Sequence, residues 1–157
     1  MAVFSGDEVF QIAMELEETG QVFYEALAAG CGDVKVADIC RRLARQEIDH
    51  YNKFKLLRER LVSRPASHPL TLEEMDFAQA LINDRVVPDP AKARELAVKG
   101  SVAEALDLAI KLEKDSILFY MDVLPAVDGK DADAIRQIIA EEKRHAQELI
   151  FARRDYH

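Results

Sequence analysis

The sequence has no continuous apolar run that approaches the roughly 20 residues needed to span a bilayer. Its first residues, Met-Ala-Val-Phe-Ser-Gly-Asp, also lack the basic and apolar regions of a secretory signal. It has only two cysteines, Cys31 and Cys40, and no Cys-x-x-Cys pair, which argues against a disulfide framework and against a four-cysteine iron site. We therefore expect a cytoplasmic protein that has no membrane span.

The charge pattern also lacks the concentrated basic face that binding to nucleic acid requires, because the formal net charge is −8. We expect no nucleic-acid partner. One predicted helix is locally basic, and two interpretations of it stay open: a solvated helix face, which is favoured, and a docking patch for an acidic redox partner. The residues concerned are Arg41, Arg42, Arg45, Arg58, Arg60 and Arg64.

No stretch reads convincingly as a strand, whereas the high content of Ala, Leu, Glu, Lys and Arg favours helix. The 157 residues, of which 49% are hydrophobic, suffice for a single domain over 1–157 with a hydrophobic core. Ser5, Thr71 and Ser101 are each followed three residues later by Glu, which is typical of a helix start. Together with the glycine and proline breaks, these signals predict helices over 5–29, 34–62, 101–124 and 131–153.

The segment 64–100 contains four prolines and is too long for a tight turn. A helix of about 26 residues is roughly 39 Å long at about 1.5 Å per residue, so a crossover between two parallel helices needs a connection of this size. Apolar spacing predicts short helical structure within the segment, covering the bundle surface. The same segment could instead pair with a second chain, and a homodimer is the assembly we expect.

Each half of the chain contains one glutamate and, about thirty residues later, a Glu-x-x-His motif. Counting along each predicted helix in steps of three and four places all of these residues on apolar stripes. A single motif of this kind is weak evidence, but two copies in register with the apolar stripes are not expected of surface residues. The residues are Glu17, Glu47 and His50 in the first half, and Glu113, Glu142 and His145 in the second.

Four carboxylates that converge on one core need compensating positive charge, because burying each of them costs several kcal/mol. Two divalent cations would neutralise the four glutamates. The i, i+3 spacing of each Glu-x-x-His pair places both side chains on one helix face. The sequence therefore predicts a site for two metal ions, and carboxylates with one imidazole per ion suit iron or manganese.

These residues resemble those of the rubrerythrin branch of the ferritin-like superfamily. The Phe23-Tyr24 and Phe119-Tyr120 pairs, which end seven residues beyond the first glutamate of each half, strengthen the likeness. The resemblance implies an all-α, ferritin-like four-helix bundle with a long crossover between the second and third helices. It also implies bridging roles for Glu47 and Glu142, terminal roles for Glu17 and Glu113, and nitrogen ligands from His50 and His145.

By the same resemblance, the function would be a non-haem di-iron oxidoreductase that reduces hydrogen peroxide and protects against oxidative stress. The small-molecule substrate would be peroxide or dioxygen, and the two metal ions would be iron, with zinc or manganese left open. Two alternatives remain: an iron-binding, ferroxidase or iron-storage protein, and a bundle that holds structural zinc or another redox-silent pair. Tyr24 and Tyr120 could donate hydrogen bonds to the terminal glutamates or only pack in the core.

Two departures from the family pattern bear on the reaction. Rubrerythrins usually carry a rubredoxin-like iron domain that supplies electrons, whereas this sequence ends at His157 without one. We therefore expect a separate redox donor protein. Rubrerythrins also tend to have a glutamate one turn after the third-helix ligand, where this chain has Ser116, matched by Gly20 in the first half. We expect a more symmetric site.

Overall fold

The computed structural model describes residues 6–61 and 101–156 and, between them, only residues 71–73, 76, 80, 91, 95, 98 and 99. Four long helices make up the two continuous ranges: α1 (Gly6–Gly30), α2 (Val34–Leu61), α5 (Val102–Val123) and α6 (Gly129–Arg153). A short 3-10 helix, η1 (Leu124–Ala126), lies between the last two. The predicted helix bounds agree with these to within two residues, and no strand occurs in the described ranges.

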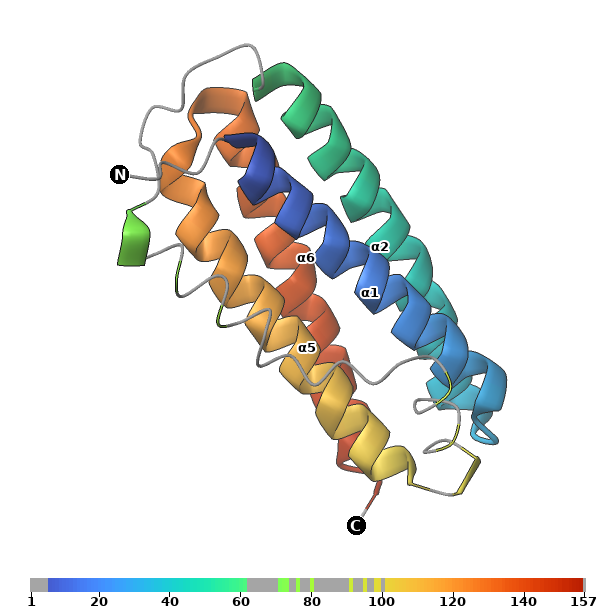
Figure 1. Ribbon diagram of the computed structural model, residues 1–157. Helices are drawn as coiled ribbons and strands as arrows, with labels where there is room; N and C mark the ends of the chain where they lie inside the picture. The colour runs from blue at the N-terminus through green and yellow to red at the C-terminus, as the bar shows by residue number, and fades with distance from the viewer. Residues whose placement is uncertain are drawn as a thin grey trace.

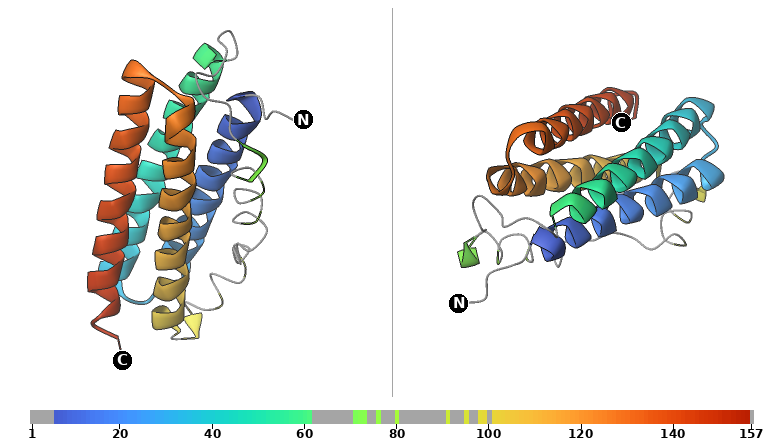
Figure 2. Two further views of the ribbon diagram at one scale, coloured as in Figure 1. Left: turned by 90° about the vertical axis from the view of Figure 1, so that its left-hand side faces the viewer. Right: turned by 90° about the horizontal axis from the view of Figure 1, so that it is seen from above.

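The helices form two antiparallel hairpins, α1 with α2 and α5 with α6, which pack against each other as a four-helix bundle (Figures 1 and 2). Helices α2 and α5 run in the same direction, so the chain between Leu61 and Val102 has to return from one end of the bundle to the other. The predicted all-α bundle with a long crossover is confirmed. The short helical structure predicted within 64–100 falls almost wholly outside the described residues.

The predicted apolar stripes form the core of the bundle. Their buried residues gather in two clusters, one around Phe10 and Phe54 and the other around Leu43 and Leu106. On each helix the residues of one cluster precede the predicted ligands and those of the other follow them. The polar residues at mid-length are therefore closed off from both ends by apolar side chains. None of the described helices has the length and apolar character needed to cross a membrane.

One of the three predicted helix starts can be compared in full with the structure, and it differs from the predicted capping pattern. Ser101 precedes α5 but makes no capping hydrogen bond with its side chain, so the capping-box prediction is wrong there. Its backbone, with φ −81° and ψ 44°, lacks the extended geometry from which a side chain reaches back to the helix amides. At α2 the cap is Asp33, whose Oδ1 accepts hydrogen bonds from the second and third helical amides at 2.9 and 3.3 Å. Ser5 and Glu74 lie outside the described residues.

Candidate metal centre

Each of the four helices brings a predicted ligand to the middle of the bundle. Helices α1 and α5 contribute one glutamate each, while α2 and α6 each contribute a glutamate and a histidine one turn apart. All six side chains are buried, with at most 4% of each residue exposed. The structure thus brings together every residue of the predicted ligand set: Glu17, Glu47, His50, Glu113, Glu142 and His145.

The ligand atoms fall into two overlapping groups, and within each group they lie within 4.8 Å of one another. The carboxylate of Glu142 faces both imidazoles, because its Oε1 lies 3.1 Å from His50 Nδ1 and its Oε2 lies 2.9 Å from His145 Nδ1. The two rings are 5.7 Å apart and nearly parallel. One group contains Glu17 and His50, the other contains Glu113 and His145, and both contain Glu47 and Glu142.

The two predicted tyrosines cross between the halves of the bundle. Tyr24 on α1 donates a hydrogen bond to Glu113 on α5, and Tyr120 on α5 donates one to Glu17 on α1. Burial, followed by the neighbouring glutamate charges, raises the pKa of both hydroxyls well above its usual value, so they remain protonated donors. The rings also pack in the core, with Tyr120 4.8 Å from Phe54. Each hydroxyl therefore donates to a glutamate of the opposite half while its ring packs in the core, which goes beyond packing alone.

The carboxylates and imidazoles have strongly perturbed pKa values. Burial and then the charges of neighbouring glutamates raise the pKa of Glu47 and Glu142 well above the ordinary value. Burial opposes a charge on His50, but the adjacent carboxylates of Glu142 and Glu17 outweigh it and raise its pKa to about 11. Nearby carboxylates likewise outweigh burial at His145 and raise its pKa to about 9. The metal-free site therefore holds protons that bound metal ions would displace.

Several features of the site fit a pair of divalent cations. Glu17 Oε2 and Glu47 Oε1 are buried and have no hydrogen-bond partner in the described part of the chain. The nearest ring nitrogens, His50 Nδ1 and His145 Nδ1, lie 3.6 Å from these oxygens, and a buried carboxylate oxygen without a hydrogen bond is favourable only when a cation lies close to it. Gly20 leaves room for the Glu47 carboxylate, because a Cβ there would lie 2.6 Å from Glu47 Oε2. Four carboxylates with two imidazoles match the donor preferences of iron and manganese.

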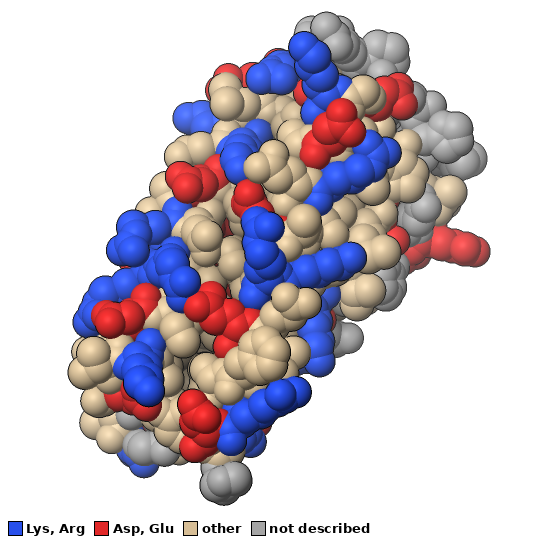
Figure 3. Space-filling view, turned by 180° about the vertical axis from the view of Figure 1, so that it is seen from behind, with Lys and Arg blue, Asp and Glu red and all other residues tan. Residues whose placement is uncertain are grey.

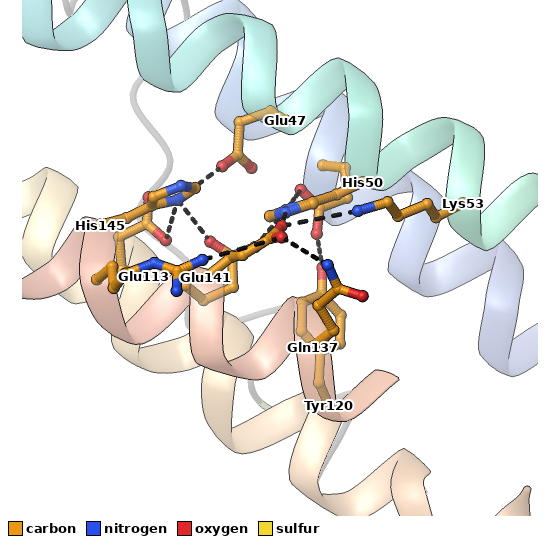
Figure 4. Close-up of polar contacts among 11 residues, drawn as sticks. Glu47, His50, Lys53, Glu113, Tyr120, Gln137, Glu141 and His145 are labelled. Atoms are coloured by element: carbon orange, nitrogen blue, oxygen red, sulfur yellow. Dashed lines mark hydrogen bonds and ion pairs between the residues drawn. The ribbon is translucent and has the colours of Figure 1, made fainter. Parts of the chain in front are cut away.

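Glu141 also contacts the site, although it was not among the predicted residues. Its Oε2 lies 2.6 Å from His50 Nε2, and Lys53 Nζ lies 3.8 Å from the same oxygen (Figure 4). Partial burial raises its pKa, but the hydrogen bond and charge of His50 outweigh burial and hold the pKa below its usual value. Because Glu141 lies off the apolar stripe, its sequence position resembles that of any surface glutamate, and no sequence signal marks it.

The face formed by α2 and α6 carries many Lys and Arg side chains (Figure 3). Some of them pair with acids on their own helix, as Arg41 does with Asp38 and Arg136 with Asp133, both at 2.8 Å. These two pairs occupy equivalent positions in the two halves of the chain. Such pairing favours the interpretation of this basic surface as a solvated face.

No protein-family model matches the chain, and no curated protein matches it. Among solved structures, it is similar to a crystal structure from Thermotoga maritima whose assignment as a ferritin-like diiron-carboxylate protein is provisional. The two are 23% identical, the match covers 98% of this chain and 97% of the other, and the TM-score is 0.72. At this identity the likeness establishes the fold. The chain therefore has the ferritin-like four-helix fold of that structure, with a buried cluster of carboxylates and histidines at its centre.

Proposed function

We propose that this chain binds two iron ions at the central cluster and acts as a non-haem di-iron oxidoreductase that reduces hydrogen peroxide. The observation that carries the proposal is the pair of overlapping ligand groups that share two glutamates. In this assignment Glu17 and His50 would hold one ion, Glu113 and His145 would hold the other, and both ions would share Glu47 and Glu142. Such a ligand set would leave coordination positions open for a small molecule.

When bound, an iron pair supplies two electrons, the number that converts one peroxide and two protons into two waters. The protein residues orient the site and exclude bulk water. Tyr24 and Tyr120 fix the terminal carboxylates through their hydrogen bonds, and the apolar clusters close the bundle on both sides. The electrons would come from a separate donor protein. That donor and the homodimer remain predictions.

The proposal is tested by anaerobic titration of the metal-free protein with iron(II), followed by addition of peroxide. We expect saturation at two irons per chain, rapid oxidation by peroxide, and return to the reduced state when a reductant is added. Iron uptake that continues past two per chain after oxidation would instead indicate iron storage. Tight binding of two zinc ions without paired iron binding would indicate a structural metal site.

Variants of buried and exposed glutamates test which residues are needed for binding of the metal pair. Glu47→Ala and Glu142→Ala each remove a group shared by both ligand sets, so each should abolish paired binding. Glu18→Ala is the matched control, because Glu18 is an exposed glutamate on α1 beside the buried Glu17. It should bind two irons as the unaltered protein does. Retention of two irons by either bridging variant would contradict the assignment of those glutamates.

A further inference from the structure

The two halves of the site differ at the outer nitrogens of their histidines. His50 Nε2 lies 2.6 Å from Glu141 Oε2. His145 Nε2 is buried and has no hydrogen-bond partner among the residues that the structure describes. The position equivalent to Glu141 in the first half is Gln46, which makes no hydrogen bond to that nitrogen. Of the two histidines in the site, therefore, only His50 has a carboxylate beside its outer ring nitrogen.

The contact with Glu141 sets where the ring proton of a metal-bound His50 would lie. A carboxylate can only accept a hydrogen bond, so once a metal ion replaces the proton on Nδ1, the remaining proton would reside on Nε2 and be donated to Glu141. That Nδ1 faces the cluster, 3.1 Å from Glu142 and 3.6 Å from Glu17. A carboxylate behind an imidazole in this way orients the ring and makes the facing nitrogen a stronger metal ligand.

Glu141 is itself held in place from several directions. Gln137 Nε2 donates a hydrogen bond to its Oε1 at 3.3 Å, and Lys53 Nζ lies 3.8 Å from its Oε2 (Figure 4). An Arg144 nitrogen lies 3.9 Å from its Oε1. Its side chain is 18% exposed, whereas that of His50 is 1% exposed. Glu141 therefore provides a positioned negative charge at the edge of the buried site, beside one histidine and not the other.

We propose that Glu141 is a positioning residue that makes the two metal positions inequivalent, so that the position beside His50 binds its ion more tightly and fills first. This inference rests on the metal pair of the proposed function. Loss of a hydrogen-bonded group behind a metal ligand typically weakens metal binding by about 10 to 100-fold. The two dissociation constants should therefore differ by at least about 10-fold in the unaltered protein.

The experiment is an anaerobic cobalt(II) titration of the metal-free full chain, followed by visible absorption, with the variants Glu141→Gln and Gln46→Glu. The unaltered protein should show two resolved steps. In Glu141→Gln the first step should weaken by about 10-fold or more while the second changes little. In Gln46→Glu the second step should strengthen, because the new carboxylate can reach His145 from the equivalent position. Anomalous diffraction at one cobalt per chain should show the higher occupancy beside His50.

Lys55→Gln is the control for a general change of surface charge, because Lys55 is an exposed lysine on α2, the helix that carries His50. It should leave two resolved steps. Two cobalt ions that bind with equal affinity, or steps that Glu141→Gln leaves unchanged, would overturn the role of Glu141 while leaving the metal pair intact. A chain that binds neither cobalt nor iron would overturn the proposed function itself. If Glu141→Gln does not fold, the Gln46→Glu titration and the occupancy measurement decide the question.

Discussion

Gly20 is the position at which one added methyl group should separate metal binding from folding. A Cβ at this site would lie 2.6 Å from Glu47 Oε2, whereas ordinary contacts begin near 3.4 Å, so the carboxylate would have to move by about 0.8 Å. Functional groups in a metal site must be held within about 0.5 Å of their productive positions. Gly20→Ala should therefore weaken binding of the metal pair by about 10-fold or more.

The effect of Gly20→Ala on the metal-free fold should be much smaller. Alanine gains about 1 kcal/mol over glycine within a helix, while overpacking a core costs about 1–3 kcal/mol. The free energy of unfolding of the metal-free variant should thus fall by about 0–2 kcal/mol in urea denaturation. Gly32→Ala is the control, because nothing lies within 4 Å of a Cβ at that position. Wild-type metal affinity in Gly20→Ala would refute the placement of Glu47 as a shared ligand.

Three further predictions concern the stability of the protein. Tyr24→Phe and Tyr120→Phe each remove the donor to a buried carboxylate, so each should lower the free energy of unfolding by about 1–3 kcal/mol in urea denaturation, and unchanged midpoints would contradict this. The folded-state pKa values of His50, about 11, and His145, about 9, lie above the ordinary 6.5. Protonation of these histidines therefore stabilises the folded state fully below pH 6.5, and this contribution is lost as pH rises through the two raised values. The melting temperature of the metal-free protein should accordingly fall as pH is raised above neutrality. Added manganese should raise the melting temperature more at higher pH, because its binding then displaces fewer protons. A melting temperature independent of pH would argue against protonated histidines in the site. Phe54→Ala should lower the free energy of unfolding by about 3–5 kcal/mol, since this ring is fully buried beside Tyr120, and a loss below about 1 kcal/mol would show that the cluster repacks.

The fold and the central cluster could be predicted because both depend on local periodicity. Ligand-type residues interrupt the apolar stripe of each helix at mid-length, and antiparallel hairpins necessarily bring mid-length positions to one level. The doubling of the pattern excluded an accidental surface motif. Glu17 and Glu113, which belong to no motif on their own, were identified because each lies on its stripe at the same distance from a Glu-x-x-His pair.

Other features depend on how the helices pack, which local patterns do not specify. That Tyr24 serves the glutamate of the opposite half follows from the contact between α1 and α5 and cannot be read from its distance to Glu17 in the sequence. Glu141 reaches His50 across the α2 and α6 interface although it stands off the stripe. Ser101 fits a helix-start pattern, but its backbone geometry, set by the chain that enters α5, prevents the side chain from capping.

The most direct test of the two-metal site is anomalous diffraction from crystals of the protein loaded with iron or manganese. Two peaks should lie between Glu47 and Glu142, about 3.5–4 Å apart, one beside His50 Nδ1 and the other beside His145 Nδ1. A single peak, or peaks that avoid these four residues in fully loaded protein, would contradict a paired metal centre in this bundle.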